Sequence, residues 1–516
     1  MQERASGILI HPSCFPSHGG IGDFGPAAYD FLDFLSAAGQ TAWQILPLGP
    51  VGYGNSPYSC ISAFAGNPLL ISLERLAERG WIDEKRVRAL PNGVSPINFE
   101  QLERTKIPLL QEAAANFLRD ANDTDRERFN KFCWLNGWWL EDYVLFETLR
   151  RHFSADSWNH WPRALAERKP EALEKARREF AGEINQGRAI QFAFYEQWRA
   201  LHQECKRRGI KIVGDVAIFV SYDSSDVWAH PDLFRLNDDL SSEVVAGVPP
   251  DYFSKTGQRW GNPLYRWEVL RERGYEWWMQ RMKWALQTCD MVRIDHFRGF
   301  ESCWEIPAEE ETAINGRWIK GPGDEFFYVL RQTFGELPLI AEDLGLITDE
   351  VVALRERIGV PGMRVLQFGF GDKGAHMYLP HKYKENTVVY TGTHDNDTTV
   401  GWWRNSSRPE EREAAKAYFG DAPDGIHWAM IRAAETSVAK LCVIPLQDVL
   451  GLDSDCRMNI PSHPEGNWTW RYRSEELTRA VAEKLRAVTD LADRIPSDVA
   501  ETAKKSDGEA AEYFSA

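Results

Sequence analysis

The chain has 516 residues, 43% of them hydrophobic and 26% charged, so it can bury a large core and has the composition of a globular protein. Its 60 Lys and Arg residues against 76 Asp and Glu residues give a formal net charge of −16. This excess of acid argues against nucleic acid or an anionic membrane as the main partner, because both bind basic patches.

The sequence also carries signals about its compartment. The first ten residues include no apolar segment typical of a signal peptide, and no run approaches the roughly 20 apolar residues of a membrane span. The eight cysteines include no C-x-x-C pair, which indicates reduced and mostly buried thiols. These features predict a cytoplasmic protein, and no feature indicates an oligomeric state.

Helical and strand patterns alternate along the chain. Pro26 begins a helix and Gly39 ends it, and a strand follows; Thr348 and Gly359 bound another helix before another strand. Eight core strands are predicted, at 7–11, 42–47, 210–215, 291–295, 339–342, 364–370, 387–391 and 441–445. This count, with helices between the strands, predicts an α/β fold of the (β/α)₈ TIM barrel type.

The spacing of these strands is uneven and predicts insertions. Residues 1–48 hold the first two barrel strands, but residues 49–209 separate them from the third, far more than one crossover helix needs. Since this stretch has helical periodicity, we expect an inserted, mainly helical subdomain. Residues 210–496 hold the rest of the barrel, with a loop-rich insertion at about 221–266, and residues 497–516 form a polar C-terminal tail.

Three acidic residues stand at the ends of apolar runs: Asp295, Glu342 and Asp395. Each run predicts a buried parallel strand, and the carboxyl ends of barrel strands meet at one mouth, where barrel enzymes hold their catalytic groups. Buried ion pairs of the barrel core are the structural alternative for any one of these acids. Paired carboxylates about 5–5.5 Å apart are, however, the catalytic groups of retaining glycosidases.

The residues around Asp295 and Glu342 predict which acid is the nucleophile and which is the proton donor. Arg293 lies two residues before Asp295, so both side chains point to one face of the strand, and the guanidinium would keep Asp295 ionised and nucleophilic. Glu342 would need a raised pKa to hold a proton at neutral pH.

Metal and cofactor sites are not predicted. His394 stands beside acids, but no second His or Cys lies at ligand spacing. The acid-rich segment 448–455 lacks the glycine and the terminal glutamate of an EF-hand loop. The glycine-rich segment 49–54 does not open a helix, which makes it a poor phosphate-binding loop.

Segment 247–263 combines paired prolines, several glycines and Trp260. It resembles the loop that covers the active site in 4-α-glucanotransferases of the amylomaltase (disproportionating enzyme) family. The resemblance extends over about residues 7–473 and includes the motifs Asn55-Ser56-Pro57-Tyr58, Arg293-Ile294-Asp295-His296-Phe297-Arg298-Gly299, Ala341-Glu342-Asp343-Leu344-Gly345 and Arg457-Met458-Asn459. Pro461-Ser462-His463 departs from the Pro-Gly that more often follows the last motif, which leaves the shape of that rim loop open.

The resemblance implies an enzyme that moves α-1,4-glucan segments from a donor to the 4-hydroxyl of an acceptor glucan or glucose. It implies a retaining double displacement without a cofactor, on maltooligosaccharides, starch or glycogen. Asp295 would be the nucleophile, Glu342 the acid/base, and Asp395 the acid that binds sugar hydroxyls and stabilises the transition state. The implied substrate contacts are Tyr58, Asp215, Trp260, Arg293, His394 and Asn459, with Ser56 and Gln258 in addition.

Two other functions use the same residues. A hydrolase of the α-amylase kind would have the same acids and use water as acceptor. A carbohydrate-binding protein built on an inactive barrel is the second alternative, and the intact acids at all three positions argue against it.

Overall fold

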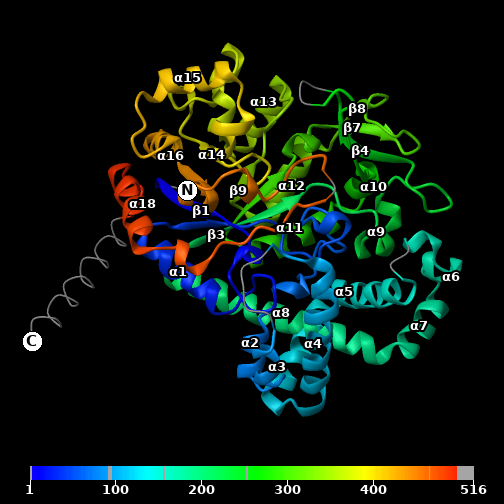
Figure 1. The fold of residues 1–516 in the computed structure, drawn as a ribbon. Helices are drawn as coiled ribbons and strands as arrows, with labels where there is room; N and C mark the ends of the chain where they lie inside the picture. Colours follow the sequence, from blue (N-terminus) through cyan, green and yellow to red (C-terminus); the bar gives the residue numbers. More distant parts are fainter. Residues whose placement is uncertain (1–2, 91–95, 155–156, 251–253, 464, 497–516) are drawn as a thin grey trace, which may run out of the picture.

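In the computed structural model, the described residues are 3–90, 96–154, 157–250, 254–463 and 465–496. Among these residues, eight parallel strands form a closed barrel in the order β1-β12-β11-β10-β9-β6-β3-β2 (Figure 1). Their bounds are β1 Ala5–Leu9, β2 Ala42–Gln44, β3 Lys211–Ala217, β6 Met291–Asp295, β9 Leu339–Ala341, β10 Gly362–Val365, β11 Thr387–Tyr390 and β12 Leu441–Pro445. The predicted TIM barrel is therefore confirmed.

The strands β6 and β12 have the predicted bounds, and the largest difference concerns the strand predicted at 364–370. Only its start belongs to β10, because Leu366–Phe370 turns into a 3₁₀ helix. Leu366 and Phe370 leave the barrel wall and join a separate apolar cluster with Leu379 and Trp402. An apolar run predicts burial, but it does not show whether the residues continue as a barrel strand or turn into a helix that packs in another cluster.

Helices follow most strands and cover the barrel. Their bounds are α1 Pro26–Ala37, α2 Leu73–Glu78, α3 Glu84–Arg88, α4 Phe99–Asp120, α5 Asp123–His152, α6 Arg163–Ala166, α7 Pro170–Glu179, α8 Ala181–Arg207, α9 Ser225–Ala229, α10 Trp267–Glu272, α11 Glu276–Thr288, α12 Gly323–Phe334, α13 Asp349–Ile358, α14 Thr399–Gly401, α15 Pro409–Phe419, α16 Ile426–Thr436, α17 Leu446–Leu450 and α18 Arg479–Leu491. Within the predicted insertion, α4 and α5 pack along α8, which leads directly into β3. The predicted tail 497–516 lies outside the described residues.

A second sheet stands beside the barrel, over β4 Val244–Val248, β5 Gln258–Pro263, β7 Ser302–Pro307 and β8 Arg317–Lys320. In the part of the chain that the structure describes, it has four antiparallel strands in the order β5-β4-β7-β8 (Figure 1). The segment predicted as a loop-rich insertion at about 221–266 thus contains two strands and α9. Of these two strands, β4 pairs with β7, which lies more than forty positions away, and local pattern does not reveal such a partner.

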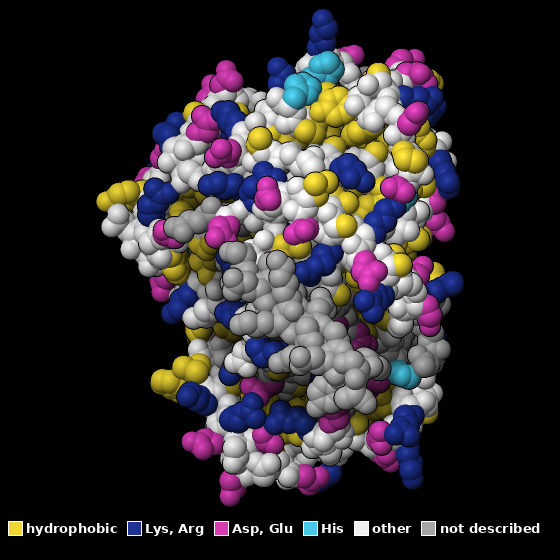
Figure 2. Space-filling model, turned by 90° about the vertical axis from the view of Figure 1, so that its left-hand side faces the viewer, with side chains coloured by type: hydrophobic (Ala, Val, Ile, Leu, Met, Phe, Trp, Pro, Cys, Tyr) yellow, Lys and Arg dark blue, Asp and Glu magenta, His cyan; other side chains and the backbone are white. Residues whose placement is uncertain are grey.

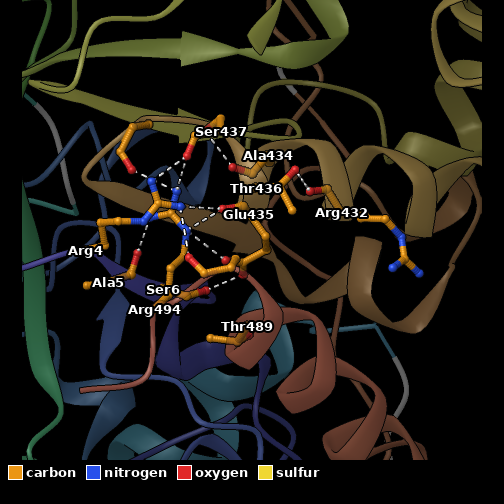
Figure 3. Close-up of polar contacts among 12 residues, drawn as sticks. Arg4, Ala5, Ser6, Arg432, Ala434, Glu435, Thr436, Ser437, Thr489 and Arg494 are labelled. Carbon is orange, nitrogen blue, oxygen red and sulfur yellow. Dashed lines mark hydrogen bonds and ion pairs between the residues drawn. The ribbon is translucent and has the colours of Figure 1, made fainter. Parts of the chain in front are cut away.

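Arg494, which comes shortly after α18, lies at the end of the barrel where β1 and β12 begin, and its side chain is fully buried (Figure 3). Its guanidinium donates to the carbonyl oxygens of Glu435 (2.7 Å), Ala5 (2.9 Å) and Ala439 (2.8 Å), and pairs with the Glu435 carboxylate at 3.1 Å. Burial raises the pKa of Glu435 to about 7, although Arg494 opposes this shift. The network joins β1 to the segment that precedes β12. It therefore stabilises the seam of the barrel, which is the pairing of its first strand with its last.

Charged side chains of both signs are interspersed over the face that lies to the left in Figure 1 (Figure 2). Such a mixed surface agrees with a composition of 60 basic and 76 acidic residues. Among the described residues, no helix combines the length and apolar character needed to cross a membrane.

Candidate active site

The barrel brings two of the predicted acids to the carboxyl ends of neighbouring strands. Asp295 is the last residue of β6, and Glu342 directly follows β9. The parallel register pairs Ile294 with Ala341, which places Asp295 level with Glu342. Asp395 comes five residues after β11 ends at Tyr390, so the prediction that it ends a strand is wrong, and a loop carries it instead.

A chain of polar contacts leads from Tyr58 through Asp215 on β3 to Arg293 and Asp295 on β6. Tyr58 donates its hydroxyl hydrogen to Asp215 Oδ2 at 2.7 Å, and one guanidinium nitrogen of Arg293 reaches the same oxygen at 2.7 Å. Another nitrogen of Arg293 pairs with Asp295 Oδ1 at 2.9 Å. The predicted placement of Arg293 and Asp295 on one face is therefore confirmed. Burial raises the pKa of Asp215 to about 7, and Arg293 opposes this shift.

Glu342 has the environment of a proton donor. Burial and, to a lesser degree, the neighbouring Asp295 together raise its pKa to about 8, although Arg293 partly opposes them. The carboxylate accepts hydrogen bonds from the backbone N–H groups of His296 (2.8 Å) and Leu344 (3.0 Å), which fix its position. His296 presents its N–H from a left-handed backbone conformation, with φ of 52°. A pKa of about 8 favours the protonated form of the Glu342 carboxyl at neutral pH.

Asp395 is more open, with 47% of its side chain exposed. Asn459 donates to its Oδ1 at 2.7 Å, His394 Nε2 lies 3.4 Å from the same oxygen, and Arg457 donates to its carbonyl oxygen at 3.0 Å. Burial lowers the pKa of His394, so its ring is neutral at pH 7. That ring stacks on Tyr58 at a centroid distance of 5.0 Å, which links Asp395 to the polar chain of β3 and β6.

Trp260 and Gln258 lie on β5, at the border of the site. The indole of Trp260 is 38% exposed and donates to Gln258 Oε1 at 3.1 Å. Its ring meets the ring of His296 edge to face at 4.7 Å. Ser56 accepts a hydrogen bond from the backbone N–H of Tyr58 at 3.2 Å. Residues 251–253 of the predicted covering segment lie outside the described residues.

The site residues expected from the sequence thus fall into two groups of contacts, one around Arg293 and one around Glu342, which meet where Asp295 adjoins His296 in the chain. Reasoning from sequence missed two members of these groups. His296 contacts Glu342 through its backbone and Trp260 through its ring. Trp468 packs near both Tyr58 and His394, at 6.2 and 5.9 Å between ring centroids. His296 stands inside the motif 293–299, and Trp468 inside the stretch 7–473 over which the resemblance extends, and these were the only signals available for them. Ser462 has φ of 67°, a conformation that favours glycine and so accounts for the glycine more usual there.

The chemistry that this arrangement can perform follows from the different states of two carboxyl groups. Asp295 is ion-paired with Arg293, whereas Glu342 is buried and its raised pKa favours the protonated form. A nucleophilic carboxylate beside a carboxylic acid is the pair that retaining glycoside chemistry requires. Among the described residues, no group of three or more His, Cys, Asp or Glu side chains is arranged to hold a metal ion.

Comparisons with known proteins agree on one family. The family model described as 4-alpha-glucanotransferase matches residues 10–478. A 4-alpha-glucanotransferase of Thermus thermophilus is 48% identical over 95% of this chain and 99% of its own length, and a chloroplastic/amyloplastic one of Solanum tuberosum is 43% identical over 94% and 85%. The structure of an amylomaltase from Streptococcus agalactiae in complex with acarbose superposes with a TM-score of 0.92, at 37% identity, over 95% of this chain and all of that one.

Proposed function

The chain belongs to the 4-alpha-glucanotransferase family and has that activity on α-1,4-glucans, and we propose that it works by a retaining double displacement centred on Asp295 and Glu342. The observation that carries this proposal is the contrast between the two acids. Asp295 is ion-paired with Arg293, whereas burial raises the pKa of Glu342, level with it on the next strand, to about 8.

In the first step, an oxygen of Asp295 attacks the anomeric carbon of the donor glucan. The bond from that carbon to the leaving O4 breaks, and Glu342 gives its proton to this oxygen. The product is a glycosyl group bound covalently to Asp295 with inverted configuration. Because Glu342 is now ionised, it is ready to act as a base.

In the second step, Glu342 takes the proton of the acceptor's 4-hydroxyl, whose oxygen attacks the anomeric carbon. Asp295 leaves as a carboxylate, and the second inversion restores the α configuration. Both groups return to their starting states, so the cycle closes without a cofactor.

The remaining residues would hold the glucan. Asp395, oriented by Asn459 and His394, is suited to accept hydrogen bonds from sugar hydroxyls, since almost half of its side chain is exposed. The exposed indole of Trp260 offers a flat face for a pyranose ring. Tyr58, Asp215 and Arg293 form the polar wall beside Asp295. Ser56, bonded to the backbone of Tyr58, and Gln258, bonded to the indole of Trp260, would be further contacts.

The substrates and the compartment are also part of the proposal. Acarbose, bound by the Streptococcus agalactiae relative, supports α-glucans and maltooligosaccharides as ligands of the same site here. The eight cysteines all lie among the described residues and are free thiols, which fits the cytoplasm. Starch or glycogen metabolism would be the setting.

A transferase should conserve reducing ends, and this distinguishes it from a hydrolase. Maltotriose is expected to yield glucose and longer maltooligosaccharides with little net gain of reducing ends. Trp260→Ala should lower the transfer rate by about tenfold and hydrolysis less, because water needs no stacking platform. Chromatography of the products together with a reducing-end assay measures both rates. Trp134→Ala, which removes an exposed indole from α5, is the matched control and should leave both rates unchanged. A steady rise of reducing ends with the wild-type enzyme would instead favour hydrolysis.

Arg293 should set the pH range of the reaction. Arg293→Gln removes the cation that pairs with Asp295 and that opposes the raised pKa of Glu342, so both limbs of the pH profile of kcat/KM should move to higher pH. Arg293→Lys keeps the charge and should shift the limbs less. Initial rates from pH 4 to 10 give the profile. Unmoved limbs in Arg293→Gln would show that Arg293 only orients the substrate.

A further inference from the structure

The loop that carries Asp395 is fixed at both ends by a single buried carboxylate, that of Asp448. Asp448 lies in α17, directly after β12, and is 1% exposed. Its Oδ2 accepts a hydrogen bond from Thr391 Oγ1 at 2.6 Å, at the start of the loop. At the end of the loop, Thr399 donates its backbone N–H to Asp448 Oδ1 (2.6 Å) and its hydroxyl to Oδ2 (2.8 Å).

These contacts use both oxygens of the carboxylate. The N–H of Thr399 can only donate, so Oδ1 must accept, and both threonine hydroxyls reach the other oxygen, Oδ2, which an ionised carboxylate lets both of them donate to. Both threonines are fully buried, so water does not replace a lost partner. The two ends of the loop are therefore bound to the same point, and only the part between them, which includes Asp395, extends toward the mouth.

The segment that follows Asp448 contacts the same loop closer to its tip. Ser454 donates to Asp397 Oδ2 at 2.9 Å. Arg457 donates to the carbonyl oxygen of Asp395, and Asn459 to its carboxylate. Residues 446–459 thus hold the loop at its base, its middle and its tip, through Asp448, Ser454, and Arg457 with Asn459.

We propose that Asp448 is a positioning residue that sets the place of Asp395 in the active site. It lies behind the loop, and its effect on the reaction passes through Asp395. The inference rests on the proposed role of Asp395 and adds to it a residue to which neither the sequence nor the family resemblance gives a function. A shift of the loop base moves the Asp395 carboxylate away from the sugar hydroxyls, and a misplacement of about 1 Å can lower a rate by about a hundredfold.

The first test compares Asp448→Asn with Asp448→Ala. Asparagine keeps one acceptor for the N–H of Thr399 and can donate to a hydroxyl, whereas alanine keeps neither. With maltotriose, kcat should fall by about 10- to 100-fold in Asp448→Asn and further in Asp448→Ala, while KM changes less than about threefold. Thr391→Val, which removes one donor with little change of shape, should give a smaller loss and serves if the alanine variant does not fold.

A control separates positioning from general loss of stability. Arg494→Met removes the buried guanidinium at the opposite end of the barrel, so it should lower Tm clearly but leave kcat within about twofold at temperatures well below unfolding. Asp448→Asn should lower kcat at a temperature where circular dichroism shows it fully folded. If the two variants lose kcat in proportion to their loss of Tm, the positioning role is refuted.

A double-mutant cycle tests whether Asp448 acts through Asp395. In an Asp395→Asn background, Asp448→Asn should lower the residual rate by less than about twofold, because the carboxylate that it positions is already gone. An equal fold loss in both backgrounds, or a wild-type kcat for Asp448→Asn alone, overturns the inference while the role of Asp395 stands. A wild-type kcat for Asp395→Asn alone overturns that role and this inference together.

Discussion

Asp295→Asn is expected to lower kcat for the disproportionation of maltotriose by more than about a thousandfold, with the fold intact. An amide oxygen is a far weaker nucleophile than a carboxylate, so the covalent glycosyl-enzyme would no longer form. The substitution keeps the size of the side chain and an oxygen that can face Arg293. Initial rates by chromatography, with circular dichroism to confirm folding, measure the effect.

The matched control for Asp295 lies at the opposite end of the same strand. Asp290 directly precedes β6 and accepts hydrogen bonds from His202 and from the backbone N–H of Ile212, away from the mouth. Asp290→Asn should keep kcat within about twofold of wild type, since it touches none of the groups of the proposed mechanism. Near-wild-type turnover in Asp295→Asn would remove Asp295 from its proposed role.

Glu342→Gln is expected to lower kcat by about 10²- to 10⁴-fold and to abolish the alkaline limb of the pH profile. In the wild-type enzyme the active form is the protonated one. With a pKa of about 8, activity should be retained below that pH and should fall about tenfold per unit of pH above it. Glutamine does not titrate, so the residual activity of the variant should not show this limb. Rates between pH 6 and 10 give both results.

The choice of donor separates the role of Glu342 from that of Asp295. Fluoride leaves from α-maltosyl fluoride without a proton donor, so Glu342→Gln should form the glycosyl-enzyme from this donor at close to the wild-type rate, whereas Asp295→Asn should not. Fluoride release in a single turnover is the measurement. Glu336→Gln, an exposed acid before β9, is the control and should behave as wild type. Equal failure of both catalytic variants would contradict the division of roles.

Much of the barrel was predictable because its strands are buried runs bounded by clear helix signals. The strands β6 and β12 were predicted to the residue, and the acid that ends β6 and the acid that follows β9 were found with them. The end of β10 and the sheet around β4 were missed, since tertiary packing decides whether an apolar run stays extended and which distant strand it meets.

The site was predictable to the extent that its residues stand in recognisable motifs. Asp295, Glu342 and their partner Arg293 follow from strand periodicity and charge, which are local properties. Asp448 does not, because its function depends on two threonines that are 57 and 49 residues away in the chain. Its neighbouring acids suggested only a calcium loop, which they fail to match.

The seam of the barrel also restricts how the protein can be made. The first strand, β1, finds one of its two partners in β12, and Arg494 completes the seam by bonding to Ala5. On the ribosome, β1 is therefore synthesised long before β12 and must wait with an unpaired edge until β12 has emerged. Premature release of a nascent chain before residue 494 would leave this edge open to other chains.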